Sequence, residues 1–86
     1  MDEQKRIVQY QMIKYGGVRV KLAELLNSRG ITRNHLSTLT GIKYNTVDRY
    51  YKADNVEWVD LDFLAKVCYV LDCDISDLLE YVPPEK

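Results

Sequence analysis

The stretch 32–52, TRNHLSTLTGIKYNTVDRYYK, constrains the fold most, because its pattern predicts two short helices joined by a tight turn. Thr32 is suited to cap the first helix, in which Leu36 and Leu39 are the apolar positions. Gly41 then breaks the pattern, and glycine adopts the positive φ angle of a tight turn without the steric cost that a Cβ brings. The stretch therefore predicts a helix, a turn and a second helix in close succession.

The second helix of this pair, expected over residues 43–52, has one apolar side and one polar side. Val47, Tyr50 and Tyr51 follow the i, i+3, i+4 spacing that places them on one side of a helix. The opposite side carries amide, carboxylate and basic groups, with a lysine and a tyrosine at its leading end: Asn45, Asp48, Arg49, Lys52, Lys43 and Tyr44. Such a helix offers hydrogen-bonding groups that suit the bases of a DNA major groove.

The chain before this pair predicts one further helix, over residues 21–28. Its buried stripe consists of Leu22, Leu25 and Leu26. Gly30 lies just past its end, where a left-handed residue is favoured. The segment 18–20, Val-Arg-Val, is short, β-branched and alternating, so we expect it to be extended. Residues 1–17 fit either a helix or a strand, and their pattern leaves both open.

The chain after the pair predicts two more helices. Asp60 is expected to cap the first, whose apolar residues recur with a 3.6-residue period: Leu61, Leu64, Val67, Cys68 and Leu71. Ser76 is expected to cap the second, which continues through Leu78, Leu79 and Val82 until Pro83 ends it. The loop 53–59 is unusually apolar, and one or two of its large residues are expected to fill the edge of the core: Val56, Trp58 and Val59.

Together these residues resemble the phage-repressor family of helix-turn-helix regulators, the Cro and lambda-repressor type that is also called XRE-type. The resemblance rests on the helix pair and on the closing segment LDFLAKVCYVLDCDISDLLEYV, and it extends over about residues 18–83. It implies an all-α fold, a compact five-helix lambda-repressor-like DNA-binding domain, with a short N-terminal extended or strand segment. We accordingly expect residues 1–17 to be an N-terminal extension, a candidate for dimerisation, and residues 18–86 to be the helix-turn-helix domain.

The DNA-contacting positions of the family fall on specific residues of this chain. The resemblance implies base contacts by Lys43, Tyr44, Asn45 and Arg49, at the start and on the outer face of the second helix of the pair. Among them, arginine can bond guanine in a bidentate manner, and asparagine can bond adenine likewise. It implies contacts to the DNA backbone by Arg33, Thr46 and Lys52.

Asp48 departs from this pattern, because it places an acid on the polar side of the second helix. It could accept a hydrogen bond from cytosine, pair with Lys52 one turn further on, or repel phosphate if DNA is not the ligand. The loop 53–57 also lacks the glycine and basic residues with which the family often touches the DNA backbone. The loop therefore predicts fewer phosphate contacts, and weaker binding, for each monomer.

The charge of the chain is divided unevenly along its length. Residues 1–52 carry ten Lys and Arg against four Asp and Glu, a balance of +6, and residues 53–86 carry two against nine, a balance of −7. The formal net charge of −1 therefore conceals a basic half, which contains the helix pair. Because phosphate attraction dominates protein–DNA affinity, a basic face matters more than a basic total.

The other side chains argue against an enzyme. His35 is the only histidine and has no recognisable catalytic partner, and the chain has no glycine-rich phosphate loop. Cys68 and Cys73 are spaced for neither a zinc site nor a disulfide, so we expect reduced thiols. We expect no cofactor, no metal and no small-molecule substrate. No apolar run approaches the ~20 residues of a membrane span, and no secretory leader is evident, so a cytoplasmic protein is expected.

The leading hypothesis is a sequence-specific transcriptional regulator, a repressor of a bacterium, phage or mobile element, that binds double-stranded DNA with helix 43–52. The alternative is a protein-binding module, such as an antitoxin-like or accessory partner, that keeps the fold without operator binding. One short helix reads too few base pairs to select a site in a genome, so a homodimer is expected. Its interface could be the N-terminal segment through Val20, which we favour, or a C-terminal helix with Tyr81 and Val82.

Overall fold

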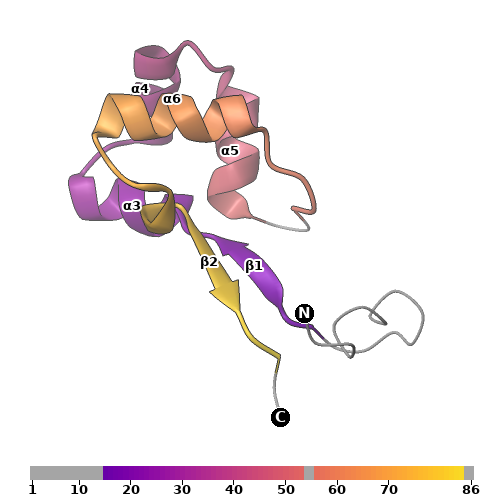
Figure 1. Cartoon of the computed structure of the whole chain (residues 1–86). Coiled ribbons are helices and arrows are strands. Elements are labelled where there is room, and N and C mark those ends of the chain that lie inside the picture. Colours follow the sequence, from indigo (N-terminus) through magenta and orange to yellow (C-terminus); the bar gives the residue numbers. More distant parts are fainter. Residues whose placement is uncertain (1–14, 54–55, 85–86) are drawn as a thin grey trace.

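Residues 15–53 and 56–84 are described by a computed structural model, and within them four α-helices pack above a two-stranded antiparallel ribbon (Figure 1). The elements in chain order are β1 (Gly17–Val20), α3 (Leu22–Arg29), α4 (Arg33–Thr40), α5 (Tyr44–Lys52), α6 (Leu61–Leu71), the 3-10 turn η1 (Ile75–Asp77) and β2 (Leu79–Val82). The expected helix or strand over residues 1–17 falls almost entirely outside the described residues. None of the described helices has the length and apolar character needed to cross a membrane.

The ends of the helices follow the local signals in the sequence. The hydroxyl oxygen of Thr32 accepts a hydrogen bond from the His35 N–H at 3.0 Å, which confirms Thr32 as the N-cap of α4. Asp60 caps α6 by accepting from the Asp62 N–H at 2.9 Å. Gly30 and Gly41 end α3 and α4 in the left-handed conformation, with φ angles of 66° and 74°. Such angles are accessible to glycine at little steric cost, so these two ends are fixed locally.

A single apolar core joins the four helices to the ribbon. Its fully or nearly fully buried members are Leu22, Leu25, Leu26, Leu36, Val47, Tyr50, Phe63, Leu64, Val67, Leu71 and Leu78. Leu39 and Leu61 belong to the apolar positions that the sequence pattern assigned to these helices, but both are exposed. On α6 the inward position belongs to Phe63, whose ring lies 4.3 Å from that of Tyr50. The buried stripe of α6 is therefore rotated away from Leu61.

The expected fifth helix over 76–82 is wrong, and the described part of the chain has four α-helices. Asp74 and Asp77 form a reciprocal capping box that closes only one 3-10 turn. The chain then extends into β2, which pairs antiparallel with β1 in the register Gly17 with Val82 and Val20 with Leu79. The β-branched and aromatic residues of β2 suit this pairing, and Pro83 follows the strand instead of ending a helix. The fold is thus mostly helical but not all-α.

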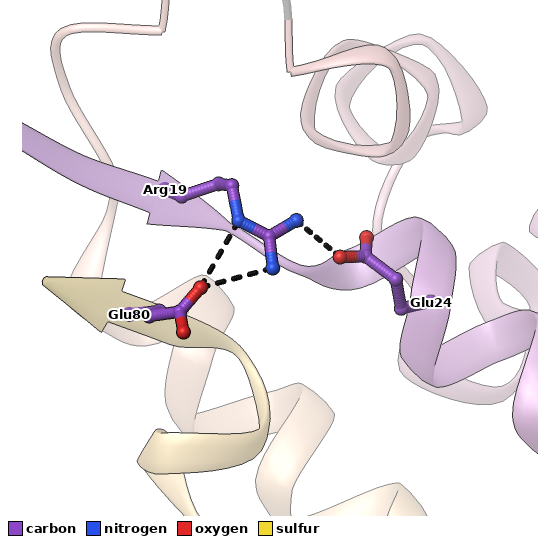
Figure 2. A network of polar contacts seen from close by, with 3 residues as sticks. All are labelled: Arg19, Glu24 and Glu80. Carbon is purple, nitrogen blue, oxygen red and sulfur yellow. Dashed lines mark hydrogen bonds and ion pairs between the residues drawn. The ribbon is translucent and has the colours of Figure 1, made fainter. Parts of the chain in front are cut away.

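An ion-pair network on one face of the ribbon joins it to the helical body (Figure 2). Arg19 on β1 donates from Nε and Nη2 to Oε1 of Glu80, its partner across the ribbon, at 3.1 and 2.9 Å. Its Nη1 donates to Glu24 on α3. These bonds lower the pKa of the Glu24 carboxyl and raise that of Arg19. The extended segment 18–20 expected from the sequence is therefore confirmed as part of β1, with a defined place against α3.

The loop between α5 and α6 covers one edge of the core. Val56 and Val59 are half-buried and pack against the core residues, which confirms the expected use of one or two apolar loop residues. Trp58 lies between them in the sequence but is 81% exposed. The tryptophan thus adds an apolar side chain to the surface beside α6.

Candidate nucleic-acid interface

The turn between α4 and α5 is fixed by side chains of α4. Ser37 donates its hydroxyl to the Ile42 carbonyl at 2.5 Å, and the Thr40 hydroxyl oxygen accepts from the Ile42 N–H at 3.2 Å. Ile42 itself packs against the core. Because both hydrogen bonds and the apolar contact hold the same residue, the start of α5 has a defined position relative to α4. The two helices form the helix-turn-helix that the sequence predicted.

Helix α5 has a buried side and an exposed side. Val47 and Tyr50 are buried, and Tyr51 is half-buried against the core, as expected from their spacing. The residues expected to contact bases are all exposed: Lys43, Tyr44, Asn45 and Arg49. Lys43 is the N-cap position of α5 and not its first helical residue. A row of amide, phenol and cationic groups thus follows the outer side of α5 from its first turn.

Arg49 makes a contact within the chain. Its Nη2 donates to the Tyr50 hydroxyl oxygen at 2.9 Å, and its guanidinium carbon lies 4.7 Å from the centre of the Tyr50 ring. The same hydroxyl oxygen accepts the Asp60 N–H at 3.2 Å, so Tyr50 links α5 to the start of α6. A base contact by Arg49 would require its guanidinium to leave Tyr50. This contact between sequence neighbours has no signal in a helical pattern, because i and i+1 side chains do not normally face each other.

A second group of contacts gathers Arg33, Asp48, Lys52 and Tyr51 at the junction of α4 and α5. Arg33 Nη1 lies 2.5 Å from Asp48 Oδ1, and Lys52 Nζ lies 3.1 Å from Asp48 Oδ2. The guanidinium carbon of Arg33 also lies 4.4 Å from the centre of the Tyr51 ring. The hydrogen bond from Lys52, together with that from Arg33, holds the pKa of the Asp48 carboxyl below its ordinary value despite partial burial. Asp48 is therefore charged at neutral pH.

Of the three residues expected at the DNA backbone, two belong to this group. The Lys52 pair with Asp48 follows the i, i+4 spacing and confirms one of the alternatives weighed for Asp48. The Arg33 pair joins residues 15 positions apart on two helices, and a pattern along one helix cannot reveal it. Thr46, the third, is half-buried near the start of α5.

This chain belongs to the family described as the Cro/C1-type HTH DNA-binding domain, whose match covers residues 21–84. It is thus a helix-turn-helix DNA-binding transcriptional regulator of the XRE type, and the family is not enzymatic.

Similar proteins include a prophage-derived regulator of Bacillus subtilis and two proteins of known crystal structure. The Bacillus subtilis (strain 168) protein named SPbeta prophage-derived uncharacterized HTH-type transcriptional regulator YopS is 31% identical over 70 residues, which are 81% of this chain and 93% of that protein. The crystal structure of the transcriptional regulator VanUg superposes with a TM-score of 0.63 at 29% identity, over 84% of this chain and 93% of VanUg. A Bacteroides fragilis protein of known crystal structure gives a TM-score of 0.64 at 25% identity, over 74% of this chain and 100% of the other.

Proposed function

We propose that the protein is a sequence-specific repressor that inserts the start and outer side of α5 into the DNA major groove and acts in the cytoplasm. The observation that carries the proposal is the row of exposed hydrogen-bonding side chains on a helix whose opposite side is buried. Because its buried side fixes the helix, the base-reading groups project from a backbone in a defined position. Occupation of an operator by such a small protein would block access of other proteins to the promoter.

The proposed roles follow the chemistry of each side chain. Asn45 would bond adenine, Arg49 would bond guanine once it leaves Tyr50, and Lys43 and Tyr44 would contact bases at the start of the helix. Arg33, Thr46 and Lys52 would bind the DNA backbone and set the position of α5 in the groove. In this arrangement, only the first four side chains carry sequence preference.

The test is a binding-site selection from random duplex DNA, followed by a salt titration on the selected and on a mixed sequence. We expect a short enriched motif, and a logarithm of affinity that falls linearly with the logarithm of salt concentration by about 0.9 for each phosphate contacted. If the selection recovers no motif, the proposal of sequence-specific binding is wrong. If the protein shows no salt-dependent binding to duplex DNA, the whole proposed function is wrong.

We further propose that the protein binds as a homodimer through the ribbon. The two surfaces that the sequence offered meet in one ribbon, because β1 and β2 pair with each other: Val18 lies opposite Tyr81, whereas Val82 lies opposite Gly17 on the other face. Side chains alternate along a strand, so Val18, Val20, Leu79 and Tyr81 share the ribbon face opposite Arg19. Val20 and Leu79 pack on the core, whereas Val18 and Tyr81 extend the apolar face into solvent at 63% and 61% exposure. Residues 1–17 would add to this contact, and residues 18–86 would bind DNA.

Light scattering on the full chain tests the dimer. We expect a dimer at micromolar concentration, and a monomer after Val18→Lys, which places a charge on the proposed contact. Tyr69→Lys is the matched control, because Tyr69 is an exposed apolar residue on α6, away from the ribbon. If the control dissociates the dimer and Val18→Lys does not, the interface lies on the helical body instead.

A second candidate function is a protein-binding module. Its support is two exposed aromatic side chains, Trp58 before the start of α6 and Tyr69 near the end of that helix, which are 81% and 89% exposed. Large aromatic residues in such positions are common in protein interfaces. This candidate is favoured over the DNA-binding repressor if the salt titration shows no binding to duplex DNA while the fluorescence of Trp58 changes when a protein partner is added.

A further inference from the structure

Arg33 and Lys52, which the proposed function assigns to the DNA backbone, both lie against Asp48. Two cations expected at DNA phosphates are both bound to one carboxylate, with a separate oxygen for each. Within residues 33–53, Asp48 is the only acid, against four basic residues. Asp48 thus forms ion pairs with two of these four basic residues, Arg33 and Lys52.

The surroundings of Asp48 make this more than a loose surface contact. Its side chain is only 22% exposed, and that of Arg33 is 35% exposed. The Tyr51 ring lies beside the Arg33 guanidinium, and the Tyr51 hydroxyl donates to Asn27 Oδ1 at 3.3 Å. Arg33 is therefore held between a carboxylate and an aromatic ring that is itself bonded to α3. Lys52 is more exposed, at 61%, and closes the other side of Asp48.

A carboxylate and a DNA phosphate are alternative acceptors for the same cations. A phosphate that binds Arg33 or Lys52 must displace Asp48, so the free energy of that contact is reduced by the loss of the pair. Base contacts elsewhere on α5 can compensate for this loss on a matching sequence, but a mismatched sequence provides none. An internal anion at this place would therefore lower affinity for arbitrary DNA more than affinity for the operator.

We propose that Asp48 is a specificity-determining residue, which competes with DNA phosphates for Arg33 and Lys52 and so suppresses sequence-independent binding. This inference rests on the proposed function. It assigns Asp48 no contact with a base. On mixed-sequence DNA both pairs stay closed, and on the operator they open and the two cations bind phosphate.

The test compares Asp48→Asn with the parent on mixed-sequence duplex DNA. Asparagine keeps the size of the side chain, and its amide oxygen can still accept a hydrogen bond from Arg33 or Lys52, so the variant should fold. The salt slope should steepen by about 0.9 for each cation released. With about 1 M salt as the reference, each released cation raises affinity about 15-fold at 50 mM and about fourfold at 200 mM. The ratio of operator to mixed-sequence affinity should fall.

Two controls separate this mechanism from a general effect of charge. Asp62→Asn makes the same charge change in an i, i+4 pair with Lys66 on α6, where the distance is 2.8 Å, and should leave the salt slope unchanged. In a chain that already carries Arg33→Ala and Lys52→Ala, Asp48→Asn should give no gain. A gain that persists there, or an equal gain from Asp62→Asn, overturns the proposal.

Three further outcomes distinguish failure of this inference from failure of the proposed function. If Asp48→Asn binds mixed DNA like the parent but loses preference at one operator position, Asp48 reads a base, and competition with phosphate is wrong. If the parent binds duplex DNA and Asp48→Asn is indistinguishable from it on every sequence, the inference fails while the proposed function stands. If the parent shows no salt-dependent binding to duplex DNA, both fail together.

Discussion

Removal of the Tyr50 hydroxyl should destabilise the domain without creating a cavity. Tyr50 is 1% exposed, and its hydroxyl oxygen accepts from the Asp60 N–H and from Arg49 Nη2. Phenylalanine keeps the ring against Phe63, where the centroids are 4.3 Å apart, and loses both hydrogen bonds. Tyr50→Phe therefore tests the bonds that join α5 to the start of α6, separately from the packing of the ring.

The magnitude follows from two hydrogen bonds. Each contributes a net stability of about 0.5–1.5 kcal/mol, so Tyr50→Phe should lower the free energy of unfolding by about 1–3 kcal/mol. For a domain of this size, that loss corresponds to a fall in Tm of roughly 4–24 °C. Tyr50→Ala, which also empties the site of the ring, should cost about 3–5 kcal/mol.

The assay is thermal and urea unfolding followed by circular dichroism. Tyr69→Phe is the matched control, because Tyr69 is 89% exposed and its loss of a hydroxyl should change stability by less than about 0.5 kcal/mol. A Tyr50→Phe chain that melts with the parent would refute the reasoning, since the hydroxyl would then not hold α5 to α6. An equal fall in both variants would show that the effect is not specific to the buried site.

The remaining predictions concern the core, the DNA contact and a thiol. Val47→Asp should unfold the domain, because it places an unpaired charge in the core at a cost of several kcal/mol, and a parental melt would contradict the burial of this side of α5. Arg49→Ala should weaken operator binding by about 1–3 kcal/mol and relax preference at one base pair, and unchanged selectivity in a repeated selection would exclude Arg49 from base reading. Burial, with a further contribution from Cys68, raises the pKa of the Cys73 thiol to about 11. Iodoacetamide at pH 8 should therefore label Cys73 about 100-fold more slowly in the folded chain than in urea, as peptide mass spectrometry can measure.

Features set by neighbouring residues were predictable from the sequence. Thr32 and Asp60 cap their helices, and Gly41 forms the turn, because each depends on hydrogen bonds or φ angles within a few residues. The buried side of α5 was also predictable, because Val47 and Tyr50 follow the period of a helix. These local features suffice to define the helix-turn-helix.

Features set by distant residues were not predictable in the same way. The segment 79–82 has apolar residues that fit a helical stripe, but the strand with which it pairs, residues 17–20, is distant from it in the sequence. Arg19 and Glu80 are 61 positions apart, so no local pattern indicates their pairing. The contact between Arg33 and Asp48 was not predictable for the same reason, because the two residues lie on different helices. For the candidate site, the sequence thus predicted which residues are exposed on α5, but not which of them bind one another.

The most direct test of DNA binding through α5 is a nuclear magnetic resonance titration of the ¹⁵N-labelled chain with its selected duplex. We expect the largest backbone amide shifts at Arg33 and over residues 43–49, with small shifts along the exposed side of α6 around Tyr69. Shifts concentrated around Tyr69 and Trp58, with residues 43–49 unchanged, would contradict the proposed DNA interface.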